Sequence, residues 1–321
     1  MGRVPPPGEG IVLKPEEFRM LRDLFATRTG VKLSAEARFA LERRLRERLI
    51  VLHLDTFADY HHYLRFGARA ADEWDEAVDL LTTNETYFFR EERQLRGFQQ
   101  ELLPMLQAQR RAQRRLTLWS AGCSTGEEAY TIAILVHQSG LFFPRRRLAP
   151  SPPLSAFPEA PDTDESLLWD IRIYGSDISR RCVAAARRGI YTESSFRATS
   201  AEVRRSCFVP QAEGWRVTEG IRQLCRFGKM NLLDEERSRA LGKADAIFCR
   251  NVLIYFDARA RKTAIEVLYE RLNPGGVLLL GHSESLLNVS TAFELLHLKD
   301  DLVYRKPVAA SGSAKIANDP T

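Results

Sequence analysis

The chain has 321 residues, of which 44% are hydrophobic and 28% charged, which is typical of a soluble globular protein of about two domains. It holds no run of about 18 apolar residues, so no membrane insertion is expected, and its first residues, MGRVPPPGEG, lack the apolar stretch of a secretory signal. The five scattered cysteines form no CxxC pair and indicate neither a zinc site nor a disulfide framework. A cytoplasmic protein with reduced thiols fits best.

The N-terminal part predicts a short disordered lead, residues 1–13, followed by an all-helical domain over residues 14–80. Apolar residues recur there at three- and four-residue steps, as amphipathic helices require. Gly30 is a plausible end for the first helix, and Ser34 a plausible N-cap for the second. The apolar positions of the four predicted helices are Phe18, Leu21, Leu24 and Phe25; Leu41, Leu45, Leu49 and Leu52; Phe57, Tyr60 and Leu64; and Trp74, Val78 and Leu81.

Residues 81–306 change character, because short apolar runs now alternate with helical patterns. This alternation predicts a doubly wound, mostly parallel sheet covered by helices on both faces, with an antiparallel edge where the chain closes. The predicted helices span 126–138, 178–189 and 260–272, the last ended by Asn273-Pro274-Gly275-Gly276. The predicted strands are 116–122, 171–177, 244–251, 276–282 and 302–306.

Two segments interrupt the alternation. Residues 144–166 are rich in proline, serine and acids and predict a disordered insertion, for which no role is apparent. Residues 190–228 predict a small β-subdomain with short antiparallel strands at 208–210, 215–217 and 224–227. The small polar residues 307–321 predict a disordered tail.

A glycine turn, Gly122-Cys123-Ser124-Thr125-Gly126, follows the first predicted strand and opens a helix. It matches the G-x-S-x-G nucleophile elbow of α/β-hydrolases, with Ser124 as nucleophile and Asp245 and His282 following in the required chain order. A hydrolase needs strands before its elbow, however, whereas everything before residue 115 looks helical. A turn that lets the backbone approach a ligand is the better interpretation.

The residues around this turn favour a ligand without phosphates. No Gly-Lys-Ser/Thr follows, as a phosphate-binding loop would need, and the pattern is not G-x-G-x-x-G. Glu127 and Glu128 would repel a pyrophosphate but suit S-adenosylmethionine (SAM), which carries a sulfonium, an ammonium and a ribose. Asp177 ends the second strand, where such folds place an acid on ribose hydroxyls; a helix N-cap is the alternative role.

Several longer motifs resemble the CheR methyltransferases, in that family's own order. They are LTTNETYFFRE (81–91), WSAGCSTGEEAYTIA (119–133), GSDIS (175–179), NLL (231–233), FCRNVLIYFD (248–257) and LNPGGVLLLGHSESL (272–286). The likeness covers residues 14–306. It implies a class I, Rossmann-like methyltransferase fold with an N-terminal helical domain and a small antiparallel β-subdomain.

The resemblance also implies which residues form the site. Arg90 and Tyr255 match the pair assigned to the reaction, although Arg90 as an interface salt bridge and Tyr255 as a packed aromatic remain open. SAM is the implied cofactor, with S-adenosylhomocysteine as product. The residues that match cofactor contacts are Asn84, Thr86, Arg90, Gly122, Glu128, Asp177, Asn231, Leu232, Asn251 and Val252.

The implied function is methyl esterification of glutamates on chemotaxis receptors. The basic helix around Arg43, Arg44 and Arg48 is expected to dock on the receptor's acidic helical bundle. The short link 211–214 favours independence from a receptor tail peptide. A monomer with no nucleic-acid partner is expected. The alternatives are a non-catalytic SAM-binding module and a methyltransferase for another substrate such as RNA, which the arginine clusters suggest.

Overall fold

The computed structural model describes residues 11–82, 84–143 and 169–308. Four α-helices come first: α1 (Pro15–Thr29), α2 (Arg38–Val51), α3 (Phe57–Phe66) and α4 (Ala70–Leu81), with a 3-10 turn at Ala35–Ala37 before α2. Their apolar stripes meet in a core of their own, so the four predicted helices are confirmed. Gly30 ends α1 in the left-handed conformation, with φ of 75°.

Residues 11–13, which belong to the predicted disordered lead, are among the described residues. Leu13 is fully buried in the helical core, and its backbone N–H donates to Glu42 of α2 at 3.0 Å. The prediction of a disordered lead is therefore wrong at residues 11–13, because Leu13 finds an apolar site beside α2. Residues 1–10, the predicted insertion 144–166 and the tail from 309 onward lie outside the described residues.

A seven-stranded sheet forms the centre of the second part of the chain, in the order β6-β2-β1-β7-β8-β10-β9. The first five strands of this order are parallel, whereas β10 runs antiparallel to both β8 and β9. The predicted mostly parallel sheet with an antiparallel edge is thereby confirmed. The strands are β1 (Arg115–Ala121), β2 (Asp170–Asp177), β6 (Cys225–Lys229), β7 (Ala244–Cys249), β8 (Leu272–Leu280), β9 (Glu294–His297) and β10 (Leu302–Arg305).

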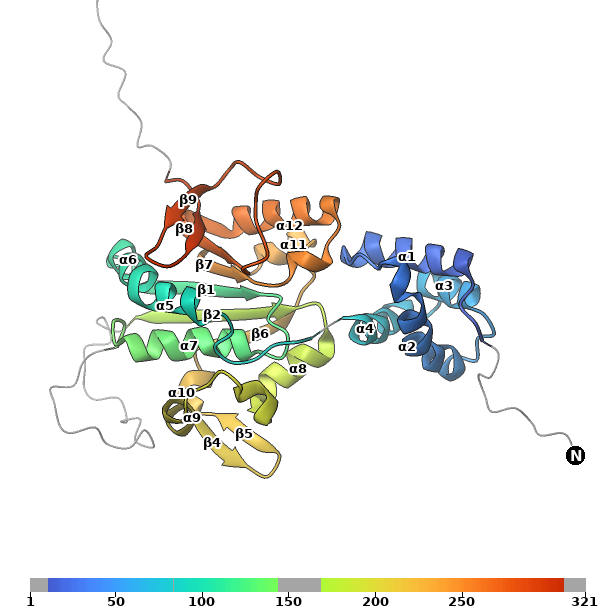
Figure 1. Cartoon of the computed structure of the whole chain (residues 1–321), viewed down its shortest axis with the longest axis horizontal. Coiled ribbons are helices and arrows are strands. Elements are labelled where there is room, and N and C mark those ends of the chain that lie inside the picture. The colour runs from blue at the N-terminus through green and yellow to red at the C-terminus, as the bar shows by residue number, and fades with distance from the viewer. Residues whose placement is uncertain (1–10, 83, 144–168, 309–321) are drawn as a thin grey trace, which may run out of the picture.

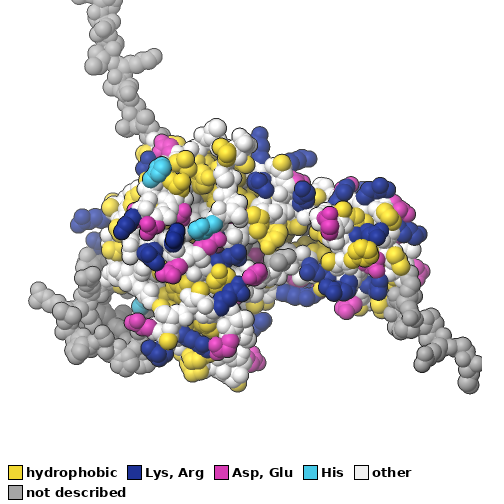
Figure 2. Space-filling model, in the orientation of Figure 1, with side chains coloured by type: hydrophobic (Ala, Val, Ile, Leu, Met, Phe, Trp, Pro, Cys, Tyr) yellow, Lys and Arg dark blue, Asp and Glu magenta, His cyan; other side chains and the backbone are white. Residues whose placement is uncertain are grey.

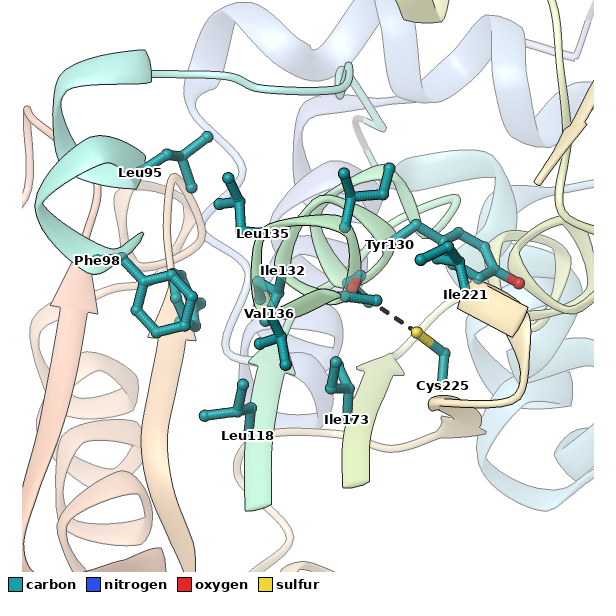
Figure 3. Close-up of a cluster of buried hydrophobic side chains, with 14 of the residues drawn as sticks. Leu95, Phe98, Leu118, Tyr130, Ile132, Leu135, Val136, Ile173, Ile221 and Cys225 are labelled. Carbon is teal, nitrogen blue, oxygen red and sulfur yellow. Dashed lines mark hydrogen bonds between the residues drawn. The ribbon is translucent and has the colours of Figure 1, made fainter. Parts of the chain in front are cut away.

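Helices cover both faces of this sheet, because successive strand residues point to opposite sides. Leu118 packs into the cluster beneath α7 (Glu127–Ser139), whereas its neighbour Trp119 packs into the cluster beneath α12 (Ala258–Arg271). Figure 3 shows the first cluster, with Leu118 and Ile173 of the strands facing Val136 of α7. The remaining helices of this part are α5 (Glu92–Gly97), α6 (Leu103–Gln109), which is joined to α5 by a π-helical turn (Phe98–Leu102), α8 (Arg180–Arg188) and α11 (Glu235–Arg239).

A second, three-stranded antiparallel sheet has the order β3-β5-β4 and confirms the small β-subdomain. The prediction of a third strand of this small sheet at 224–227 is wrong, because those residues lead into β6, which pairs in parallel with β2 in the large sheet. Cys225 of β6 is buried under α7, with its Sγ 3.7 Å from the Ala129 carbonyl (Figure 3). The elements here are β3 (Ile190–Tyr191), α9 (Ala201–Cys207), β4 (Phe208–Gln211), β5 (Gly214–Val217) and α10 (Glu219–Arg222), with a 3-10 turn at Glu193–Phe196.

The helix predicted over 260–272 is confirmed as α12, which ends at Arg271, but the chain passes straight into β8, so the strand begins at Leu272 and not at the predicted residue 276. Residues 273–276 belong to the strand because they bond on both of its sides, although Gly275 has φ of 78°. Asn273 Nδ2 donates to Asp245 at 2.8 Å, and Gly275 N–H donates to the Lys306 carbonyl at 2.9 Å. Strand β9 was not predicted.

Figure 1 shows the helical bundle beside the large sheet, with the small sheet on a different side. Backbone contacts join the bundle to the sheet part: Val31 forms a bridge with Phe256, and Lys32 N–H donates to the Tyr255 carbonyl at 2.8 Å. No helix among the described residues combines the length and apolar character needed to cross a membrane.

Candidate cofactor and active site

A pocket of about 280 Å³ opens where the sheet order reverses, between β1 and β7. Loops at the carboxyl ends of parallel strands meet at such a switch point and commonly bind ligands there. The bundle closes the pocket on the other side with Thr29, Val31 and Arg44. All the predicted site residues line this one pocket: Asn84, Thr86, Arg90, Gly122, Glu128, Asp177, Asn231, Leu232, Asn251, Val252 and Tyr255.

The glycine turn after β1 forms the floor of the pocket. Gly122 has φ of 81°, and a Cβ added to it would lie 2.5 Å from Val252 Cγ2, so only glycine fits there. Ser124 N–H donates to Asp177 Oδ2 at 2.8 Å, and Ser179 N–H donates to Asp177 Oδ1 at 2.8 Å. Both oxygens of Asp177 are thus held by backbone, while the side chain still lines the pocket.

Asp177 is not the N-cap of α8, because Ser179 takes that place and accepts the Cys182 N–H. The alternative role weighed for Asp177 is therefore wrong. Burial raises the pKa of Asp177, and the two backbone N–H groups oppose that shift.

The two acids after the turn point in different directions. Glu127 does not line the pocket; it accepts from Thr125 at 2.6 Å and from Ser195 at 2.9 Å. Glu128 lines the pocket and accepts from Ser120 at 2.7 Å. Burial raises the pKa of Glu128, against the opposing effect of the nearby Arg250 guanidinium.

Arg250, at the end of β7, connects the walls of the site, and sequence reasoning missed it. Its side chain is 2% exposed and pairs with Glu91 at 3.0 Å and Glu128 at 3.2 Å. It also donates to the Arg90 carbonyl at 2.5 Å. An arginine ending the apolar run ADAIFC was the available signal, because a charge beside a buried strand needs partners.

Two family models match the chain. The CheR methyltransferase all-α domain matches residues 16–82, and the CheR methyltransferase SAM-binding domain matches residues 84–145 and 160–301. The chain belongs to the CheR methyltransferase family. It is accordingly a SAM-dependent methyltransferase with the class I fold, and SAM is its cofactor.

Curated relatives agree over nearly the whole chain. Chemotaxis protein methyltransferase 2 of Vibrio cholerae is 34% identical over 92% of this chain and 95% of that protein. Chemotaxis protein methyltransferase 2 of Pseudomonas aeruginosa is 34% identical over 86% of this chain and 88% of that protein. A solved magnesium protoporphyrin IX methyltransferase from Synechocystis, with bound SAM, aligns at a TM-score of 0.30 and 16% identity, covering 76% of this chain and 94% of that one.

Arg90 and Tyr255 of this CheR methyltransferase are both available to a ligand. Among the described residues no carboxylate lies within ion-pair distance of Arg90, which donates only to the Glu85 carbonyl at 3.2 Å. The salt-bridge alternative for Arg90 is therefore wrong. Tyr255 is 37% exposed and stacks on no aromatic ring in the described ranges, so the packed-aromatic alternative is wrong as well.

The two asparagines differ in what they still offer. Asn231 Nδ2 donates to the Arg28 carbonyl at 2.8 Å and its Oδ1 accepts the Leu233 N–H at 3.0 Å, so this side chain joins the bundle to the sheet part. Asn251 Oδ1 is buried without a partner among the described residues. A buried acceptor without a donor favours a ligand donor at this place, such as the ammonium or a hydroxyl of SAM.

The hydrolase hypothesis is wrong, because its three residues do not meet. Asp245 bonds to Arg110 at 2.6 Å and to the Thr117 N–H at 2.9 Å, near the start of β1. Ser124 follows the other end of β1 and contacts the Asn84 carbonyl at 3.5 Å. His282 Nε2 lies 3.8 Å from Glu91 instead.

The arginines of α2 differ in the contacts that they make within the protein, and basic side chains are frequent on the helical lobe in Figure 2. Arg48 forms a two-pronged ion pair with buried Glu73, at 2.9 and 2.6 Å, so its guanidinium already has a partner within the bundle, and its part in the receptor contact stays a prediction. Arg44 donates to the Leu80 carbonyl at 3.2 Å and lines the pocket. Arg43 is exposed, and no partner for it occurs among the described residues.

Proposed function

We propose that this methyltransferase esterifies glutamate side chains of chemotaxis receptors. One observation carries the proposal: Arg90, which has no carboxylate partner among the described residues, lines the pocket together with Glu128 and Asp177. A guanidinium can hold a carboxylate through two parallel hydrogen bonds. The pocket therefore offers a place for a cationic cofactor next to a place for an anionic acceptor.

Bound SAM supplies a sulfonium methyl; an O–CH₃ bond forms as the CH₃–S⁺ bond breaks with its electron pair going to sulfur, which leaves a neutral ester and a neutral thioether. The acceptor needs no general base, because a glutamate with a pKa of about 4.3 is already ionised at neutral pH. The residues of the chain therefore have to position the reactants and exclude water, and positioning alone is worth up to about 7–11 kcal/mol.

Each residue of the pocket has a part in that positioning. Arg90 orients the acceptor carboxylate, and the Tyr255 hydroxyl lies at the reacting centre. Asp177 accepts from the ribose hydroxyls, while Glu128 and Asn251 face the amino-acid end of the cofactor. Arg250 donates to both Glu128 and the Arg90 carbonyl and so fixes their positions relative to each other.

The decisive assay is transfer of tritiated methyl groups from SAM to receptor cytoplasmic fragments, followed by alkaline treatment. Label released as methanol is expected, since base cleaves glutamyl methyl esters. Label that resists base would indicate N-methylation of another acceptor. Absence of transfer with intact SAM binding would support the non-catalytic binding module instead.

Variants at Arg90 sharpen the assay. Arg90→Lys keeps the charge but loses the planar pair of donors, so we expect kcat to fall by about tenfold or more. Arg188→Lys, a change at an exposed arginine of α8, is the matched control and should leave kcat unchanged. Equal activity of Arg90→Lys and the unaltered enzyme would contradict the role proposed for Arg90.

Receptor docking is proposed to use Arg43, an exposed arginine of α2 without a partner among the described residues. Reversing its charge in Arg43→Glu should raise the KM for receptor fragments about threefold or more at low salt, and leave the SAM affinity unchanged. Arg188→Glu serves as the control for charge alone. An unchanged receptor KM would exclude this face of α2 from the contact.

A further inference from the structure

The loop that follows β7, residues 250–255, carries four of the pocket residues: Arg250, Asn251, Val252 and Tyr255. A second loop, residues 281–286, follows β8. Because β7 and β8 are parallel with Cys249 opposite Leu280, the two loops leave the sheet side by side. The second loop has no part in the function described so far.

One side chain of the second loop binds the backbone of the first. Glu284 Oε2 accepts the N–H groups of Asn251 at 2.7 Å and Gly281 at 2.8 Å. Its Oε1 accepts those of Val252 at 2.9 Å and Ile254 at 3.2 Å. No cation pairs with Glu284 in the described part of the chain, so the carboxylate is balanced by backbone donors.

The conformation of the first loop needs such a support. Asn251 has φ of 58°, in the left-handed region, which asparagine adopts more readily than other non-glycine residues but still less readily than glycine. A Cβ on Gly281 would lie 2.8 Å from Asn251 Nδ2 and 2.9 Å from its backbone nitrogen, so the two loops touch tightly. Strained backbone of this kind persists when its surroundings hold it.

Val252 connects the loop to the glycine turn and to Tyr255. Val252 packs on Gly122, the first residue of the glycine turn. Tyr255 N–H donates to the Val252 carbonyl at 3.1 Å, so a displacement at Val252 would reach Tyr255.

We propose that Glu284 is a positioning residue that fixes loop 250–255 and thereby sets Asn251 and Tyr255 in the site. It does not line the pocket, so it acts on the site through the loop that it binds. The part of this inference that concerns Tyr255 rests on the proposed function, whereas the support of the loop does not.

Glu284→Gln is the direct test. The amide keeps one acceptor oxygen, but its NH₂ group faces two backbone N–H donors. Two of the four hydrogen bonds are therefore replaced by repulsive donor–donor contacts. Hydrogen exchange of the amides of Asn251, Val252 and Ile254 should become about tenfold faster or more. Glu294→Gln, which removes the charge from an ion pair with Arg305 on β9 and β10, is the matched control and should leave these amides unchanged.

A double-mutant cycle with Tyr255→Phe separates positioning from general stability. Glu284→Gln should lower kcat about tenfold in the unaltered enzyme and by a clearly smaller factor in the Tyr255→Phe background, because the part of the effect that is transmitted through Tyr255 is then absent. Additive losses, or unchanged amide exchange in Glu284→Gln, would overturn the proposal.

Gly281→Ala gives an independent measurement should Glu284→Gln not fold. Its Cβ would lie 2.8 Å from Asn251 Nδ2 and 3.0 Å from Glu284 Oε2, so it forces the carboxylate and the loop apart without removing the charge. The same amides should therefore exchange faster, and kcat should fall in the same way. Unchanged exchange in this variant would also overturn the inference. Amide exchange needs no methyl acceptor, so its result stands even if receptor glutamates prove not to be the substrate.

Discussion

The wall of the pocket that belongs to the sheet consists of buried groups with several bonds each. The contacts that attach the helical bundle are more varied, from buried Asp79 of α4, which accepts from Ser179 at 2.6 Å, to exposed ion pairs. Arg250 is 2% exposed at its side chain and has three acceptors. On the other side, Glu76 of α4 pairs with Arg180 and Arg181 of α8, whose side chains are 49% and 57% exposed. The difference suggests that the sheet wall fixes the cofactor and the bundle wall closes over it.

The largest effect is expected where the sheet wall loses its buried cation. Arg250→Gln leaves the carboxylates of Glu91 and Glu128 without their partner, which should lower the free energy of unfolding by about 3–5 kcal/mol. Urea unfolding measures this. Arg239→Gln, which breaks only the exposed pair with Glu235 on α11, is the control and should cost at most about 0.5 kcal/mol. Similar losses in both variants would contradict the buried role of Arg250.

Asp177→Asn should have the next largest effect, on SAM affinity. The change keeps the shape of the side chain but removes its charge and turns an NH₂ group toward one of two backbone donors, from Ser124 and Ser179. An affinity loss of about a hundredfold, or roughly 2.7 kcal/mol, is expected by calorimetry. Asp59→Asn, which alters the exposed capping box of α3, should leave SAM affinity unchanged. A loss below about threefold would mean that Asp177 does not hold the cofactor.

The sequence predicts the parts of these walls that depend on local pattern. Gly122 and Asp177 follow apolar strands, and strand ends in a parallel sheet meet at one edge, so their meeting in one pocket follows from order alone. The helices of the bundle follow from apolar periodicity in the same way. Strand β6 was misplaced because a run such as Leu224–Phe227 reads alike in either sheet.

Contacts between residues far apart in the chain were not predictable. Arg250 pairs with Glu91, which lies 159 positions away in the chain, and the sequence around neither residue indicates this pairing. Glu127 and Glu128 are neighbours in sequence, and the start of α7 decides which of them faces the pocket. The sequence does not distinguish the arginines of α2 from one another, although in the structure Arg48 forms an ion pair with buried Glu73.

Lowering the pH should weaken SAM binding, by less than the substitution Asp177→Asn does. Burial raises the pKa of both Glu128 and Asp177 above their ordinary values of 4.5 and 3.8, so each takes up a proton at a higher pH than in the unfolded chain. In the free enzyme these groups therefore favour the folded state below their unfolded pKa values, and this contribution is lost as pH rises through the folded ones. A cationic cofactor needs the ionised carboxylates.

The expected result is a Kd for SAM that rises as pH falls, beginning above those ordinary values, while the enzyme remains folded. Calorimetric titrations over that pH range, with circular dichroism to monitor the fold, measure it. In Asp177→Asn the dependence should be weaker, since one of the two titrating groups is gone. A Kd that stays constant down to the unfolding pH would show that neither carboxyl titrates in the site.

The smallest effect is expected in the bundle wall, at the ion pairs between α4 and α8. Glu76→Gln removes contacts of 2.5 and 3.0 Å to Arg180 and Arg181, but such half-exposed pairs contribute only about 0–1 kcal/mol and weaken further as salt screens them. We expect a correspondingly small loss of unfolding free energy, which shrinks at high salt, and an unchanged Kd for SAM. If Glu76→Gln instead cost as much as Arg250→Gln, the bundle wall would be as firmly fixed as the sheet wall. The pocket could then admit its ligands only by a movement of the sheet-side loops.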